Sequence, residues 1–208
     1  MLELDQYLIK VEKPLIQLPL LAGIVASCLL PIGTFLGTSS IAYLLTSLLH
    51  LALIVTAVGY SLELIFQLAR DAKKLGWIIA LAIGVIVGGV LLLGAHPVTA
   101  KDALIHHLAV PKMWISDGQI SEIKWHEWSY YPMLLQLVFT EFLTLGSEWA
   151  STCYHFLYLI LLGGAVSYLV QLKTKDSELS VLSACLVICL PVSIDLASTP
   201  LVDLGLAY

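Results

Sequence analysis

Between Lys13 and Glu63 the chain carries no charged residue, and this long run constrains the fold more than any other feature of the sequence. A hydrocarbon core about 30 Å thick needs roughly 20 apolar residues for each helical crossing. The run is therefore long enough for two crossings. The small polar residues at positions 37–40 in its middle are typical of the tight turn between them.

The rest of the chain has the same character. Of its 208 residues, 59% are hydrophobic and 12% are charged, whereas about a quarter of a soluble domain is charged. Apolar runs predict five crossings, over residues 14–36, 41–68, 75–95, 150–172 and 179 to about 196. We therefore predict an all-α polytopic membrane protein with about five transmembrane helices, which excludes a soluble enzyme. The net charge is −5 and Arg70 is the single arginine, so no nucleic-acid partner is expected.

Two short loops carry clustered positive charge, and this predicts their side of the membrane. Cytoplasmic loops are enriched in Lys and Arg. The basic residues are Arg70, Lys73 and Lys74 in one loop and Lys173 and Lys175 in the other. Both loops should therefore face the cytoplasm, together with the N-terminus. We predict a multi-pass protein of the plasma (inner) membrane.

An even number of crossings must separate these two loops, and the helices at 75–95 and 150–172 already supply two. The apolar stretch 131–145 between them is short and contains Gln136 and Glu141. It should therefore lie along the outer interface instead of crossing. Residues 96–149 then form a large outer loop.

That outer loop should contain amphipathic interfacial helices. Residues 100–117 predict a surface helix that breaks near Pro111 and ends at the turn pair Asp117 and Gly118. The segment 122–132 is dense in Trp and Tyr, which favour the lipid headgroup layer. In this topology Asp102 and Asp203 lie on the same face of the membrane.

Asp102 and Asp203 are the candidate catalytic residues. A carboxylate at the membrane surface can act as a general base, although Thr99 to Asp102 also fits a capping box. Asp203 stands at the start of an apolar helix, where an ionisable group suggests function or a favourable interaction with the helix dipole. Asp195 is a weaker candidate than Asp203. It lies at the end of the preceding span, where an acid can simply mark the membrane interface.

Other polar and small residues have simpler interpretations. The outer-loop histidines have no metal-ligand spacing, so no metal site is predicted and the cofactor stays unknown, with a divalent metal left open. Gly84 and Gly88 form a small-xxx-small pattern typical of close helix packing. His50 and Glu63 could line a proton path, but Glu63 can also reach the interface, and transport ranks below the enzyme interpretation.

The order of these features resembles that of the C-type integral-membrane glycosyltransferases, in particular the protein O-mannosyltransferase and aminoarabinose-transferase group. The resemblance lies in KDALIHHL at 101–108, YYPML at 130–134 and PLVDL at 200–204, with a non-spanning segment after the proline. It covers residues 75–208, which would be the N-terminal half of such a membrane domain. Residues 1–74 would be an additional two-helix membrane segment.

The resemblance implies transfer of a sugar from a polyprenyl-phosphate carrier to a lipid, glycan or protein acceptor on the non-cytoplasmic face. Asp102 matches the acid that opens the first outer loop and would be the general base, and Asp203 matches a second acid that orients the substrate or the loop. Some relatives carry a lysine before the proline, where this chain has Tyr131. The residues assigned to substrate binding are Lys101, His106, His107, Lys124 and Tyr131.

A second class of function stays open, namely a non-catalytic polytopic membrane protein such as part of a transporter or an assembly subunit. In that case Asp102 would only cap a helix and Asp203 would only mark an interface. The sequence stops at Tyr208, a few residues into another apolar segment. We therefore expect the chain to be the front part of a longer protein and to be inactive alone.

Overall fold

The computed structural model describes residues 2–208, with the side chains of residues 7–73 and 75–208. This described part is built from helices without any strand, which confirms the predicted fold class. A π-helix, η1, covers Ala103–His107, and a short 3-10 helix, η2, covers Glu127–Tyr130. The α-helices are α1 (Leu2–Ser27), α2 (Leu29–Phe35), α3 (Ile41–Asp71), α4 (Lys73–Gly94), α5 (Ala109–Asp117), α6 (Leu134–Thr144), α7 (Glu148–Thr174), α8 (Ser177–Cys189), α9 (Pro191–Ala197) and α10 (Asp203–Ala207).

Within the described residues, four helical segments are long and apolar enough to cross a membrane: Tyr7–Phe35, Ile41–Asp71, Leu75–Gly94 and Glu148–Thr174. The predicted fifth crossing is not one continuous helix, because α8 and α9 meet at a bend of 60°. Pro191 has no N–H to donate, and Leu190 before it is extended, with φ −60° and ψ 130°. The pair is long and apolar enough to cross a membrane only when both helices are taken together, and a bend of this size is typical of a broken span or a re-entrant loop.

Helix α3 lies at the centre of one bundle, packed against α1, α4, α7 and α8. Close approach of small residues holds helices together in lipid, where van der Waals contact replaces the hydrophobic effect. Gly164 of α7 is such a residue, because a Cβ added there would lie 2.6 Å from the Cβ of Ser61 in α3. The two-helix segment 1–74 is therefore packed into the same bundle as the rest.

The small-residue pattern in α4 does not have the packing role predicted for it. A Cβ added at Gly84 or Gly88 would meet no atom of the described chain within 4 Å. The prediction of close packing there is wrong for the residues that the structure describes, because this face of α4 points away from α3 and α8.

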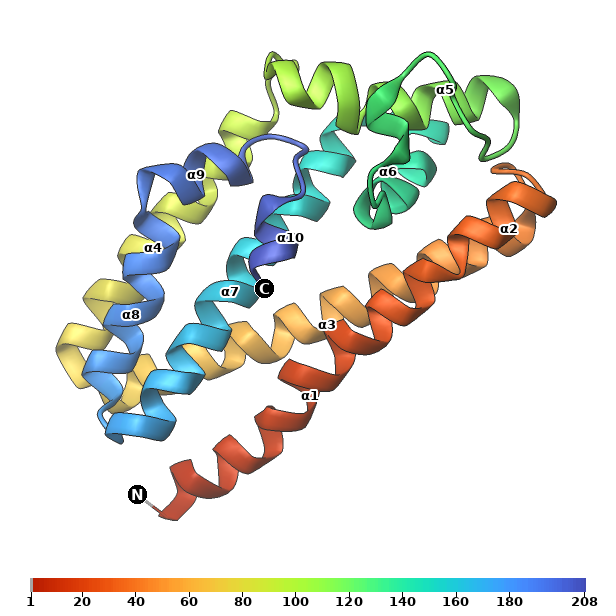
Figure 1. Cartoon of the computed structure of the whole chain (residues 1–208). Coiled ribbons are helices and arrows are strands. Elements are labelled where there is room, and N and C mark those ends of the chain that lie inside the picture. The colour runs from red at the N-terminus through yellow and green to blue at the C-terminus, as the bar shows by residue number, and fades with distance from the viewer. Residues whose placement is uncertain (1) are drawn as a thin grey trace.

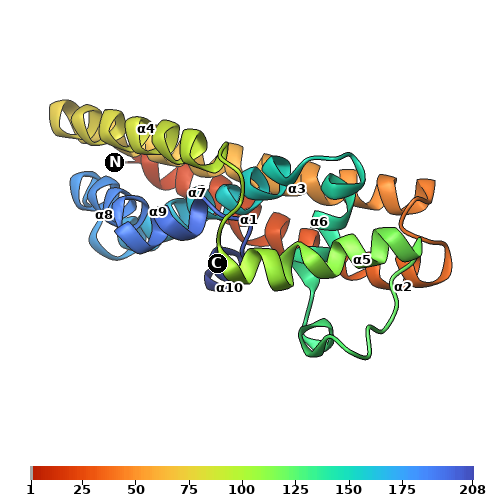
Figure 2. The same cartoon turned by 90° about the horizontal axis from the view of Figure 1, so that it is seen from above.

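The basic turns lie at one end of the bundle (Figure 1). The α3–α4 turn and the α7–α8 turn are neighbours at the same end as the N-terminus, whereas α5, α6 and the α2–α3 turn lie at the opposite end. The view from above shows the same separation (Figure 2). The grouping of loops expected from charge is therefore present in the fold.

We expect single-cysteine labelling to place these two ends on opposite sides of the membrane, with the basic end in the cytoplasm. In a variant without the four native cysteines, Thr174→Cys near the basic turn should react with an impermeant maleimide only from the cytoplasmic side. Trp125→Cys, at a side chain that is 75% exposed in the other end, should react only from the opposite side. Cytoplasmic labelling of Trp125→Cys would refute the orientation.

Helix α6 is too short to cross a membrane, as the charge pattern predicted. Its 11 residues extend only about 16 Å at 1.5 Å per residue. Every residue from 135 to 141 is buried, and α6 packs against α1, α3, α5 and α7. It is therefore enclosed by protein instead of lying exposed along the interface, and Figure 1 shows it between α5 and the α1 and α3 helices.

Burial raises the pKa of the Glu141 carboxyl in α6 above its ordinary value of 4.5. A raised pKa in the folded state gives stability that is fully present below the pKa of the unfolded chain and is lost as pH rises through the folded pKa. Glu141→Gln should therefore unfold at a higher temperature than the parent at neutral pH. The rise should be roughly 2–4 °C for each kcal/mol that the substitution adds to the free energy of unfolding. The difference should shrink at about pH 4. Thermal unfolding in detergent measures both, and an equal difference at the two pH values would contradict this cause.

Candidate functional site

Asp102 and Asp203 line the same cavity, which has a volume of about 580 Å³. The cavity lies among η1, η2, the segment before α10 and the start of α10 itself, at the end of the bundle away from the basic turns. Six of the seven residues predicted for the site line it: Lys101, Asp102, His106, His107, Tyr131 and Asp203. The other lining residues are Ile105, Trp128, Leu196, Leu201 and Val202.

The Asp102 side chain does not cap the helix that follows it. It immediately precedes η1 with helical φ and ψ of −66° and −38°, and its carboxylate makes no capping hydrogen bond to any described residue. Asp102 therefore does not act as the side-chain N-cap of η1 in the described part of the chain. The exposed carboxylate is left to face the cavity.

The surface helix predicted over residues 100–117 is divided at Leu108 instead of at Pro111. Pro111 lies in the first turn of α5, where a missing N–H costs little because first-turn N–H groups have no intrahelical partner. It offers no N–H to the carbonyl of His107, and the preceding turn widens to a π-helix in which Leu108 N–H donates to the Ala103 carbonyl at 2.9 Å. Such π-turns are frequent at functional sites.

The π-helix brings the rings of two consecutive histidines together. The centroids of His106 and His107 are 4.2 Å apart, and the rings are stacked at 29°. Nε2 of His106 is buried without a hydrogen-bond partner among the described residues. A buried polar atom without a partner is costly, so this nitrogen is an unsatisfied polar group beside the cavity that His106 lines.

His107 is neutral in this environment. Burial and the neighbouring His106 lower its pKa to about 4, against the opposing effect of the Asp203 and Asp102 carboxylates. Its Nδ1 lies 2.7 Å from the side-chain amide of Gln136 in α6. Burial likewise lowers the pKa of His106, with His126 adding to the effect. At neutral pH the cavity therefore contains two carboxylates beside two uncharged imidazoles.

A buried histidine that the sequence did not single out positions Asp203. His155 in α7 is fully buried, and its Nδ1 lies 3.1 Å from the Leu196 carbonyl and 2.9 Å from the Thr199 carbonyl. Carbonyl oxygens only accept, so Nδ1 carries the proton. Nε2 then accepts from Leu204 N–H at 3.2 Å. This one ring ties the α9–α10 segment to α7 and holds the start of α10, where Asp203 stands.

Aromatic rings form another wall of the cavity. The Trp128 ring lies 5.3 Å from Tyr131 and 5.6 Å from His106, measured between centroids. Tyr131 is 55% and Trp128 is 38% exposed. Such rings combine an apolar face with a polar edge, which suits a ligand that has both hydroxyl groups and C–H surfaces.

Lys124 does not line this cavity. It lies beside Trp125 in the outer loop and lines two smaller neighbouring cavities instead. Within the described part of the chain, Lys101 is therefore the lysine that lines the cavity. Lys112 instead forms an ion pair of 2.5 Å with Glu148, which joins α5 to α7. Among the side chains that the structure describes, no three His, Cys, Asp or Glu residues gather as metal ligands would.

Comparison of the chain with protein-family models, with curated proteins and with solved structures finds no match in any of the three.

Proposed function

We propose that this multi-pass membrane protein serves as a glycosyltransferase that takes a sugar from a polyprenyl-phosphate carrier and transfers it to a lipid, glycan or protein acceptor. The proposal rests mainly on one observation. Asp102 and Asp203 are far apart in the sequence, yet they line one cavity at the end of the bundle away from the basic turns. The Asp102 carboxylate makes no side-chain capping hydrogen bond to a described residue, and Asp203 lies in the first turn of α10.

In the proposed reaction Asp102 accepts the proton of an acceptor hydroxyl as its oxygen attacks the anomeric carbon. The bond from that carbon to the phosphate oxygen breaks, and polyprenyl phosphate leaves with the bonding electrons. Because the acceptor attacks from the face opposite to the leaving phosphate, the configuration at the anomeric carbon is inverted. Lys101 offers a positive charge to the leaving phosphate, and Asp203 orients the substrate. The neutral His106 and His107 can hydrogen-bond sugar hydroxyls without attracting the phosphate away from Lys101.

A membrane location fits this chemistry because the donor is a lipid. The cavity opens at the end of the bundle that carries the aromatic outer loop, and Trp and Tyr favour the headgroup layer, where a lipid phosphate lies. With the basic turns in the cytoplasm, the reaction would take place on the opposite, non-cytoplasmic face. In bacteria this would be the outer face of the plasma membrane.

Sugar transfer by the protein in its native membrane tests the proposal. Vesicles with and without the protein are incubated with radiolabelled polyprenyl-phosphate sugars, and label is followed into lipid, glycan and protein fractions. Protein-dependent transfer that is lost when Asp203 becomes Asn supports the proposal. Binding or passage of a solute that is indifferent to both acids would favour a non-catalytic transporter part or assembly subunit instead.

A further inference from the structure

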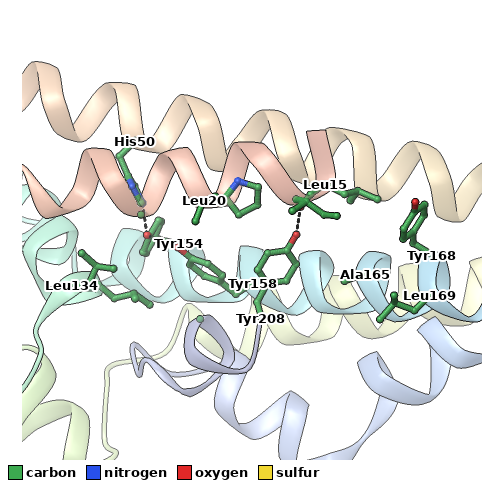
Figure 3. Close-up of a pocket in the computed structure, with 15 residues that line it drawn as sticks. Leu15, Leu20, His50, Leu134, Tyr154, Tyr158, Ala165, Tyr168, Leu169 and Tyr208 are labelled. Atoms are coloured by element: carbon green, nitrogen blue, oxygen red, sulfur yellow. Dashed lines mark hydrogen bonds between the residues drawn. The ribbon is translucent and has the colours of Figure 1, made fainter. Parts of the chain in front are cut away.

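A second cavity, of about 460 Å³, lies inside the bundle between α1, α3, α6, α7 and α10 (Figure 3). Helix α10 separates it from the first cavity, since Asp203 at the start of α10 lines the first, whereas Gly205 and Tyr208 line the second. Its walls are largely aliphatic, and the residues at its rim include Ile16, Leu20 and Leu169, which are 57%, 64% and 58% exposed. These belong to membrane-spanning segments, so the cavity opens towards the hydrocarbon of the bilayer.

A chain of buried polar groups reaches this apolar cavity. His50 Nδ1 lies 2.7 Å from the Ala22 carbonyl, and His50 Nε2 lies 2.5 Å from the Tyr154 hydroxyl. The Tyr154 hydroxyl lies 2.8 Å from that of Tyr158, which lines the cavity and is 7% exposed. Figure 3 shows Tyr154 and Tyr158 along α7, with His50 of α3 joined to Tyr154 by a dashed line.

The direction of this chain follows from its first link. The Ala22 carbonyl can only accept, so Nδ1 of a neutral His50 must carry the proton and Nε2 must accept. Tyr154 then donates its single proton to Nε2, and Tyr158 donates its proton to Tyr154. Tyr158 is left with lone pairs alone towards the cavity.

The Tyr208 hydroxyl also has no proton left to donate into the cavity. It donates to the Leu15 carbonyl of α1, so its oxygen also has only lone pairs to offer. It stands next to Tyr158 in the wall of the cavity (Figure 3). One region of an otherwise apolar cavity therefore contains two phenol oxygens that can accept a hydrogen bond but cannot donate one.

We propose that this cavity binds a membrane-soluble lipid alcohol, with its hydroxyl donating to Tyr158 or Tyr208 and its chain along the aliphatic walls. An ionised phosphate or carboxylate would bring a negative charge into an apolar cavity whose polar atoms present only lone pairs, so the cavity should reject it. The proposal concerns a site apart from Asp102 and Asp203, and it does not depend on the proposed sugar transfer.

The test compares ligands that differ only in the hydrogen-bond donor. The protein in lipid nanodiscs is titrated with tritiated hexadecanol, with its methyl ether and with hexadecyl phosphate. Hexadecanol should bind about three- to tenfold more tightly than the ether, as one net hydrogen bond allows, and the phosphate should bind least. Farnesol and dioleoylglycerol, tested in the same way, tell whether an isoprenoid or a glycerolipid better supplies the hydroxyl.

Tyrosine variants decide whether the two oxygens cause the preference. Tyr158→Phe and Tyr208→Phe should each reduce the preference for the alcohol, and the double variant should bind alcohol and ether equally. Tyr168→Phe, in the same cavity but outside the chain, is the matched control and should keep the preference. Tyr154→Phe frees the Tyr158 proton, so the ether should gain affinity. Equal binding of alcohol and ether by the parent, or a preference that survives in the double variant of correct helical content, would overturn the proposal.

Discussion

Replacing Asp102 by Asn should reduce sugar transfer by a factor of about 10²–10⁴, the usual contribution of a positioned general base. Asn keeps the size of the side chain but cannot accept the proton of an acceptor hydroxyl. The protein should stay folded, because Asp102 is exposed and its side chain makes no capping hydrogen bond to a described residue that the substitution could break. Initial rates of transfer in native membranes, at matched protein level, measure the effect.

Asp195→Asn is the matched control for this substitution. Asp195 is also an exposed acid near the same end of the bundle, on α9, but it is not among the residues that line the cavity. Its replacement should leave transfer near the parent rate. Near-normal transfer by Asp102→Asn would show that the carboxylate is not the base, and equal losses in both variants would point to a general effect of negative charge on this face.

The coarse architecture was predictable because membrane solubility is decided by composition over about 20 residues. The uncharged run before Glu63 predicted two crossings, and both are present as Tyr7–Phe35 and Ile41–Asp71. The bend at Pro191 was missed because the apolar character continues through it. A proline in such a run signals a break only when the backbone before it is extended, as it is at Leu190.

Burial by neighbours was the part of the fold that the sequence could not supply. The α6 segment is short and contains Gln136 and Glu141, and it was therefore predicted to lie along an interface, yet these two residues are 1% and 7% exposed. Gln136 is buried because it reaches His107, a partner 29 positions away. A contact between such distant positions leaves no periodic pattern in either segment.

The sequence predicted the two acids of the candidate site but not the histidine that holds one of them in position. Parity of crossings placed Asp102 and Asp203 on one face, and the two line one cavity. His155 was missed because it lies within an apolar helix without any motif. The available signal was its ionisable ring inside a span, which is costly in lipid unless it is satisfied by partners. Lys124 was placed in the site as a possible substitute for the lysine that some members of the resembled family carry before the proline, but the outer loop holds it away from the cavity.

Replacing Gly76 by Ala should strongly destabilise the α3–α4 hairpin. A Cβ at this position would lie 2.2 Å from the Ala69 carbonyl oxygen and 2.8 Å from the Ala69 Cα. These are backbone atoms, so no side-chain rotation relieves the clash, and α3 and α4 must move apart. We expect a cost of about 3 kcal/mol, at the upper end of ordinary overpacking. This corresponds to a fall of roughly 10 °C in the unfolding temperature for a chain of this size.

Gly84→Ala in the same helix separates this clash from a general effect of glycine on α4. A Cβ at Gly84 meets no described atom within 4 Å, and Ala favours a helix by about 1 kcal/mol over Gly in water. This variant should therefore unfold at or above the parent temperature while Gly76→Ala unfolds well below it. Because both substitutions add the same methyl group to the same helix, equal unfolding temperatures would mean that α4 does not pack on α3 at Gly76 as the fold requires. The α3–α4 turn would then have no defined place beside the α7–α8 turn, and the shared basic end on which the topology rests would be lost.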